Sequence, residues 1–225
     1  MIVRLSKFIL IPLLVFSLTA CAWFGGKTPV RSTPESLYQK GQQYYLDGKY
    51  KQSIEAFQRL REEYPLSKYA ISADLGIADS YFSTGNYLSA ESYYNDFVDF
   101  HPTNENLPYV MYQIGLCHYN EMLSIDRDQT QTRQARDSFE KLISRFPSSK
   151  FSFMAEKKLR DTKRRIGEHE FYVGQFYFKR GDYQAALRRF EVVAEEYANL
   201  GMDYKVSYFL HETKKRLPQE KSKTD

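Results

Sequence analysis

The chain offers few side chains that could act as a nucleophile or hold a metal ion. Its four histidines are far apart, with no His-Glu-x-x-His pattern and no paired cysteines. Cys117 beside His118 is the nearest approach to a nucleophile and its base, but adjacent residues on a helix point to different faces. No Gly-x-Ser-x-Gly motif or glycine-rich phosphate loop is present. We therefore expect Cys117 to fill a helical core, and we expect no enzyme, cofactor or metal site.

The other cysteine, Cys21, ends the phrase LTAC and predicts a lipid attachment site. Arg4 and Lys7 precede an apolar stretch, residues 8–18, which has signal-peptide length and is shorter than the about 20 residues of a spanning helix. The phrase resembles the bacterial lipobox, Leu-[Ala/Ser/Thr]-[Gly/Ala]-Cys. We expect Cys21 to carry an S-diacylglycerol and an N-acyl chain, because one chain alone binds a membrane only marginally. The alternative is an ordinary secretory signal with a cysteine near its cleavage site.

Processing at this site would leave a nearly neutral chain on a lipid anchor. Loss of residues 1–20 removes two basic residues and leaves 30 Lys and Arg against 28 Asp and Glu, which does not suggest a nucleic-acid binder. Once Cys21 is acylated, only Cys117 remains, so no disulfide framework is expected. Ala22 and Trp23 follow the cysteine without an aspartate in second place, which by analogy with enteric bacteria implies sorting to the outer membrane.

Composition divides the rest of the chain into three parts. Residues 21–34 are the lipidated N-terminus and a linker, because paired glycines and prolines lie among small polar residues. Residues 35–217 are long enough for one domain with a core of its own. Residues 218–225 begin with Pro218 and form a charged tail.

The domain repeats a short pattern. GKY, GNY and GDY occur at residues 48–50, 85–87 and 181–183, each followed by a helical pattern. Prolines at the ends of three such patterns lie 37 and 45 residues apart, near the tetratricopeptide period of about 34 with insertions. The three prolines are Pro65, Pro102 and Pro147.

Small residues recur in phase with this pattern, as two closely crossing helices require. Three pairs are 12 residues apart and the third pair along the chain is 20 apart, which is the same spacing with an eight-residue insertion. The pairs are Gly41 and Ser53, Ala78 and Ala90, Gly115 and Ala135, and Gly174 and Ala186. Aromatic residues keep the same phase at Tyr44, Tyr81 and Tyr177 and at Phe57, Tyr94, Phe139 and Phe190. We predict an all-α tetratricopeptide-repeat superhelical solenoid of four repeats plus a C-terminal capping helix.

Departures from this spacing predict where the repeats differ. Pro147 and Gly181 are 34 residues apart, against 20 for Pro65 and Gly85, so the first helix of repeat four is expected to be about four turns longer. Its basic run, residues 157–165, is expected to form a solvated face. The polar insertion at residues 120–133 is a candidate contact surface. A capping helix at residues 203–217 has three residues on one side, Tyr204, Tyr208 and His211.

The lipobox, the repeats and the phrase PYVMYQIGL at residues 108–116 together resemble the BamD family of tetratricopeptide lipoproteins. Comparable family phrases match YPLSKY at 64–69, IDRD at 125–128 and FPSSKF at 146–151. The resemblance implies a place on the periplasmic face of the outer membrane, in the β-barrel assembly machinery. It also implies three kinds of partner: a BamA-like barrel protein with POTRA domains, other assembly lipoproteins, and unfolded β-barrel clients. The family usually completes a fifth repeat, whereas this chain shows only its first helix.

The resemblance also assigns candidate sites. Six residues in the first two repeats match positions that face the groove in tetratricopeptide folds: Tyr38, Gln42, Tyr45, Leu75, Asp79 and Phe82. They are expected to hold an extended client segment. Repeats three and four are expected to dock the POTRA domains, and Arg189 matches a basic position of that interface, with Arg188 beside it.

Two other functions remain open on the sequence. A pilotin-like tetratricopeptide lipoprotein would escort a secretin or pilus component, but the long helix and residues 108–116 argue against it. A cell-wall enzyme with a tetratricopeptide front would need a further domain, and no such domain follows residue 217 in this sequence.

Overall fold

The computed structural model describes the backbone of residues 32–224 and the side chains of residues 32–217. The signal peptide, Cys21 and most of the linker lie outside the described residues, so what we expect of them stays a prediction. Within residues 32–224 the regular structure is helical, without a strand. The helices are α2 (Pro34–Leu46), α3 (Tyr50–Glu63), α4 (Ala70–Ser83), α5 (Tyr87–Phe100), α6 (Leu107–Asn120), α7 (Thr130–Arg145), α8 (Lys150–Arg180), α9 (Tyr183–Glu196) and α10 (Asp203–Thr224).

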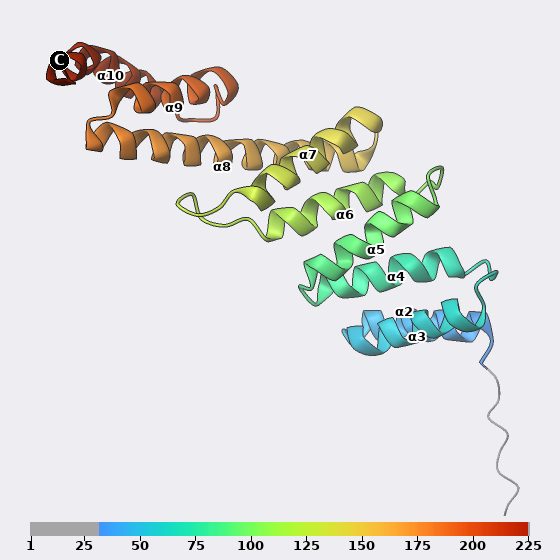
Figure 1. The fold of residues 1–225 in the computed structure, drawn as a ribbon. Helices are drawn as coiled ribbons and strands as arrows, with labels where there is room; N and C mark the ends of the chain where they lie inside the picture. Colours follow the sequence, from blue (N-terminus) through green and yellow to red (C-terminus); the bar gives the residue numbers. More distant parts are fainter. Residues whose placement is uncertain (1–31, 225) are drawn as a thin grey trace, which may run out of the picture.

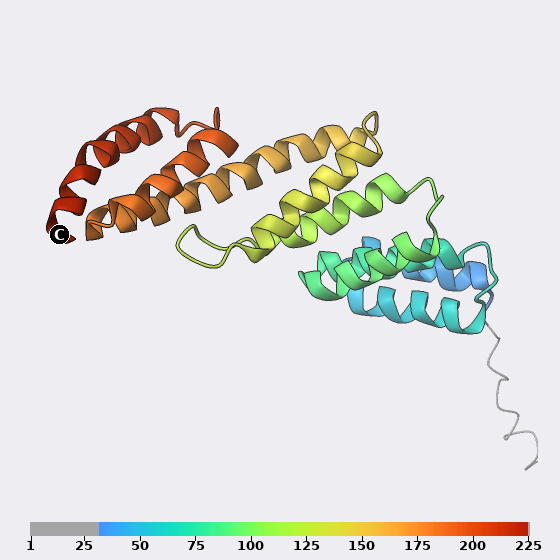
Figure 2. The same ribbon diagram turned by 45° about the horizontal axis from the view of Figure 1, so that its top comes forward.

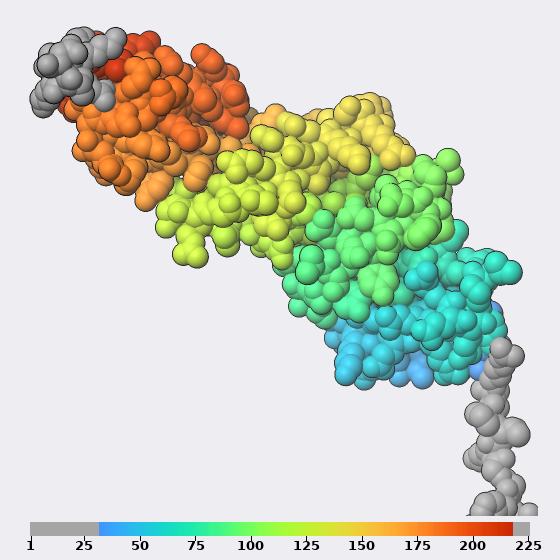
Figure 3. All heavy atoms as spheres, in the orientation of Figure 1, coloured from blue at the N-terminus to red at the C-terminus, as the bar shows by residue number. Residues whose placement is uncertain are grey.

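The helices pair into consecutive hairpins that stack into an elongated, curved body (Figures 1 and 2). Each helix packs mainly on its neighbours in sequence, and α2 also contacts α4, as α6 contacts α8. The space-filling view shows the hairpins following one another from the blue to the red end (Figure 3). The predicted tetratricopeptide solenoid of four hairpins and a terminal helix is confirmed.

Glycine closes three of the four hairpins because the turn needs a positive φ. Gly48, Gly85 and Gly181 have φ of +72°, +76° and +84°, a region that glycine enters without a Cβ clash. These are the glycines of the repeated GKY, GNY and GDY phrases. In the third hairpin, the longer loop of residues 121–129 replaces this turn.

The aromatic residues of the second helices form the centre of each hairpin. Phe57, Tyr94, Phe139 and Phe190 are at most 2% exposed. A Cβ placed on Gly174 would lie 2.6 Å from the ring of Phe190, and one on Gly41 would lie 2.5 Å from Phe57. Each of these glycines therefore faces an aromatic ring on the second helix. That ring lies four residues after the small residue with which we paired the glycine. The predicted alignment of the two helices in each hairpin is confirmed. The helices come closest where the aromatic ring of the second helix meets the backbone of the first.

Helix α8 is the predicted long first helix of repeat four, and its 31 residues serve two cores. Ala155, in its first half, packs with Phe139 and Leu142 of α7. Ile166, further along, packs with Val193 of α9 and Val206 of α10. The added turns therefore join repeat three to repeat four (Figure 2).

The terminal helix differs from its prediction in length. Helix α10 continues through Pro218 to Thr224, whereas we expected it to end at residue 217. Pro218 lacks a backbone N–H and so removes one hydrogen bond of the helix, yet the helix continues through it. Tyr204, Tyr208 and His211 lie on its exposed side, with Tyr204 86% exposed. Among the described helices, none has the length and apolar character to span a membrane.

Candidate functional site: a groove in the first two repeats and a charged junction in the last two

A groove lies between the first helices of repeats one and two. Its cavity is about 370 Å³, within the range of ligand pockets. The lining residues of α2 are three or four residues apart or adjacent, and so are those of α4. Residues at these spacings lie on the same side of a helix, so each helix turns one face to the cavity. The lining residues are Tyr38, Gln42, Tyr45, Leu46, Phe57, Ser72, Leu75, Gly76 and Asp79.

Five of the six predicted groove residues line this cavity, and Phe82 does not. Phe82 belongs to the core of repeat two, where its ring makes an edge contact with Tyr87 at 5.3 Å. It follows Asp79 by three residues on α4, and its ring packs against α5, the helix that carries Tyr87. The client-binding role of the other five stays a prediction.

Aromatic contacts hold the wall of the groove in place. The Tyr38 ring stacks on Tyr69 at 5.0 Å and lies 5.9 Å from the Phe57 ring. Gln42 donates from Nε2 to the Tyr38 hydroxyl at 2.9 Å. The Tyr45 hydroxyl is 3.1 Å from Ser83 Oγ, which ties α2 to α4. The groove is thus largely formed before any ligand enters.

Among the residues that line the groove, Asp79 is the only one with an acidic or basic side chain of the Asp, Glu, Lys, Arg or His type. Its Oδ1 accepts hydrogen bonds from the hydroxyls of Tyr94 and Tyr109, both at 2.6 Å. Burial raises the pKa of Asp79 above its usual value, while the two hydroxyls lower it in part. The same contacts and burial raise the pKa of both tyrosines. Asp79 therefore joins α4 to α5 and α6 through one oxygen.

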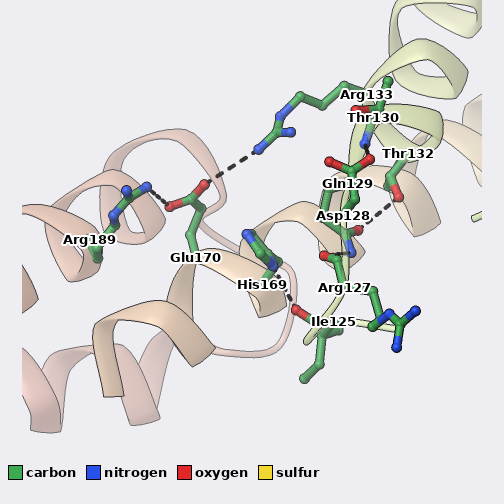
Figure 4. A network of polar contacts seen from close by, with 10 residues as sticks. All are labelled: Ile125, Arg127, Asp128, Gln129, Thr130, Thr132, Arg133, His169, Glu170 and Arg189. Atoms are coloured by element: carbon green, nitrogen blue, oxygen red, sulfur yellow. Dashed lines mark hydrogen bonds and ion pairs between the residues drawn. The ribbon is translucent and has the colours of Figure 1, made fainter. Parts of the chain in front are cut away.

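The second candidate region is the junction of repeats three and four, where Arg189 already has a partner. Its Nη1 lies 2.6 Å from Oε2 of Glu170, a residue only 8% exposed (Figure 4). Arg133 of α7 approaches the other oxygen of Glu170 at 3.9 Å. We predicted that Arg189 would reach a carboxylate of a docking partner, but the carboxylate it meets is in its own chain. Arg188 is exposed and forms no ion pair with the described residues.

The polar insertion of repeat three is fixed against α8 at the same junction. His169 Nδ1 lies 2.6 Å from the Ile125 carbonyl oxygen, and Arg165 donates to the Leu123 carbonyl at 3.0 Å. The side chain of Gln129, 1% exposed, donates to the Arg127 carbonyl inside the loop at 3.0 Å (Figure 4). The loop is thus an ordered part of the junction.

The basic run of α8 is less solvated than expected. Lys163 pairs with Glu140 at 2.7 Å, and Lys158 Nζ lies 3.9 Å from the centre of the Tyr119 ring. Arg160 donates to the Asn199 carbonyl at 3.3 Å. Several of these cations therefore attach α8 to its neighbours.

Cys117 and His118 point into different surroundings, as predicted. Cys117 is fully buried in the core of repeat two and three, and burial raises its pKa to about 12. His118 is directed to Gln131, at 2.9 Å, and to Glu91, at 3.4 Å. Among the described residues, no cluster of His, Cys, Asp and Glu has the arrangement of a metal site.

Sequence reasoning missed the partners of Asp79 and of Arg189. Tyr109 is 30 residues from Asp79, and Glu170 is 19 residues from Arg189, on a different helix in each case. Helical periodicity places residues on a face but does not tell which side chains of two packed helices meet. One signal could have found the Arg189 pair. Glu170 is at a buried position of α8, and a buried carboxylate needs a cation beside it.

Comparisons with known proteins agree with these observations. The family model described as "YfiO: Outer membrane lipoprotein" matches residues 31–225. A Rickettsia prowazekii (strain Madrid E) protein named "Outer membrane protein assembly factor BamD" is 30% identical, over 72% of this chain and 64% of that protein. A protein of the same name from Pasteurella multocida (strain Pm70) is 26% identical, over 95% of this chain and 85% of its own length. Neither relative favours the pilotin-like alternative.

A solved structure described as "TPR2AB-domain:pHSP90-complex of yeast Sti1" shares 16% sequence identity with this chain at a TM-score of 0.47. It covers 82% of this chain and 70% of that one. The repeat geometry of this chain is described from its own helices and does not depend on this similarity. The repeat fold and the family match indicate a non-enzymatic protein-interaction scaffold. Because the family model spans most of its length, this chain belongs to the YfiO family of outer membrane lipoproteins, the family of the BamD proteins.

Proposed function

We propose that the chain is a lipid-anchored periplasmic scaffold of the outer-membrane β-barrel assembly machinery, and that its groove holds unfolded barrel proteins. The names of the relatives support the assembly role. The observation that carries the proposal is the open, aromatic-walled cavity between α2 and α4.

The chemistry of an unfolded barrel strand fits this groove. Such a strand alternates apolar and polar side chains and exposes unpaired backbone donors and acceptors, which pair with other strands and aggregate unless they are covered. Tyr38 and Tyr45 of α2 and Leu75 of α4 offer apolar surface to the cavity. Gln42, Ser72 and Asp79 offer polar atoms. A segment held there is kept extended and away from other edges.

Site-specific photo-crosslinking in cells tests the groove. A photoreactive amino acid at Gln42, which is exposed at the cavity, should capture newly made barrel proteins. The matched control is Gln52, also an exposed glutamine, which lies on α3 outside the cavity. Equal capture at the two positions would contradict the proposed client site.

Repeats three and four are proposed to dock the POTRA-containing barrel protein, with Arg188 as the available cation. Arg189 is held by Glu170, whereas Arg188 is exposed and unpaired within the described residues. Other assembly lipoproteins are proposed to bind the remaining surface. Arg188→Glu should lower the affinity for purified POTRA domains about tenfold, since an interfacial attraction becomes a repulsion. Lys157→Glu on α8, another exposed cation, is the control and should leave the affinity unchanged.

Cys21 is proposed to carry the lipid anchor. Cys21→Ala should abolish metabolic labelling with palmitate, because the lipobox offers no other acceptor thiol. Labelling of the variant at the wild-type level would rule out this lipoprotein assignment.

A further inference from the structure

Asp79 presents one free carboxylate oxygen to the groove. Its Oδ1 is occupied by the hydroxyls of Tyr94 and Tyr109, but no donor of the described residues reaches Oδ2. Oδ2 is not among the fully buried, unpartnered side-chain atoms of the described residues, and Asp79 is one of the residues that line the cavity. The two hydroxyls fix the carboxylate, which makes its second oxygen a preorganised acceptor.

The rest of the lining favours a cation over an anion. It contains no lysine, arginine or histidine, although recognition of a peptide's terminal carboxylate requires cations or convergent N–H donors. Two tyrosine rings, of Tyr38 and Tyr45, stand on the α2 side of the cavity. A cation between aromatic faces and a carboxylate gains from both the ring quadrupoles and the opposite charge.

We propose that Asp79 determines the specificity of the groove, by selecting extended segments that place a lysine or arginine side chain on its free oxygen. This inference rests on the proposed function, since it assumes that the groove binds client segments. The inference adds that the groove binds a cationic side chain within the client segment and does not bind a free carboxyl terminus.

The alternative role for Asp79 is purely structural, as the acceptor for two buried hydroxyls. The two roles use different oxygens, so substitutions separate them. Tyr109→Phe removes one hydroxyl from Oδ1 and leaves Oδ2 in place. Asp79→Asn replaces the charge by an amide of the same size. Gln42→Lys adds a cation at the exposed rim and leaves the Asp79 contacts intact.

Fluorescence anisotropy with synthetic peptides tests the proposal on the whole mature protein in detergent. The probes are capped peptides of about ten residues, the length of a barrel strand, with alternating aromatic and polar residues. They differ only in a central Lys, Gln or Glu, and one version has a free carboxyl terminus. Wild-type protein should bind the Lys peptide about tenfold tighter than the Glu peptide, as expected for a charged hydrogen bond.

The variants should change this preference in different ways. Asp79→Asn should bind the Lys and Gln peptides equally, and Gln42→Lys should favour the Glu peptide. Tyr109→Phe should keep the preference for Lys even if its melting temperature falls. Equal binding of the Lys and Glu peptides by wild type, or tighter binding of the free acid, would overturn the role of Asp79 and leave the groove as a client site. Failure of every peptide to bind would overturn both.

Discussion

Two regions of the solenoid are built from the same helical hairpin: the groove of repeats one and two, and the junction of repeats three and four. They differ in the partners of one carboxylate in each region. In the groove, a carboxylate is held by two tyrosine hydroxyls and keeps one oxygen open. In the junction, the buried Glu170 faces two arginines of its own chain, and the neighbouring loop is fixed to α8. The comparison teaches that the groove carboxylate keeps one oxygen for a ligand, whereas both oxygens of the junction carboxylate face arginines of the same chain.

Helix length accounts for much of this difference. The first helices of repeats one and two, α2 and α4, have 13 and 14 residues, and a cavity remains between them. Helix α8 has 31 residues, and its added turns bring Arg165 and His169 against the repeat-three loop. The junction is therefore held together by contacts between α8 and the repeat-three loop.

The largest effect is expected from filling the space beside Gly174, which tests the close packing of α8 on α9 in the second half. In Gly174→Leu, the new side chain meets the Phe190 ring, because even a Cβ would lie 2.6 Å from it. Overpacking of this kind costs about 1 to 3 kcal/mol of unfolding free energy, or more. Urea unfolding followed by circular dichroism measures it. Gln184→Leu, at an exposed position of α9, adds the same side chain and should change little.

A smaller effect is expected from reversing the charge of Arg189. Arg189→Glu places a second carboxylate beside Glu170 and leaves Arg133 as the only nearby cation. Because the Arg189 side chain is 44% exposed, we expect a loss of about 1 to 2 kcal/mol, less than for a fully buried pair. Thermal denaturation should show it, and Arg188→Glu should melt as wild type does. A melting temperature unchanged in Arg189→Glu would mean that the pair with Glu170 contributes nothing to the junction.

The smallest effect concerns Asp79 and is a dependence on pH. Its folded-state pKa is raised, so the folded chain holds this proton more tightly than the unfolded chain does. Wild type should therefore gain stability relative to Asp79→Asn as the pH falls from about 7 to about 4, and lose it again as the pH rises. Melting temperatures of both proteins across this range measure the difference. A wild-type melting temperature that falls relative to that of Asp79→Asn as the pH decreases would show that the fold stabilises the carboxylate as the anion.

Local patterns in the sequence were sufficient to predict the hairpins and their cores. The glycine turns, the buried rings and the extra turns of α8 follow from spacing within one or two helices. Most of the groove was predictable from the resemblance, since Tyr38, Gln42 and Tyr45 match groove-facing positions of tetratricopeptide folds and share one helical face. Phe82 was expected in the groove, whereas its ring packs on Tyr87, a contact between α4 and α5 that helical spacing alone does not predict. The partner of Arg189 was not predictable, since it depends on how α8 and α9 pack and on which rotamers then meet.

The central claim is that clients are held by the first half of the chain and not by the charged junction. Ser72→Trp tests it most directly, because Ser72 is exposed at the cavity and an indole there fills the groove without entering the core. The binding of an unfolded barrel protein should be measured for wild type, Ser72→Trp, the matched exposed control Ser92→Trp, and Glu170→Gln at the junction. We predict that only Ser72→Trp loses affinity, about tenfold or more, while Glu170→Gln lowers the melting temperature and binds the client normally. Normal binding by Ser72→Trp together with loss of binding by Glu170→Gln would contradict the account.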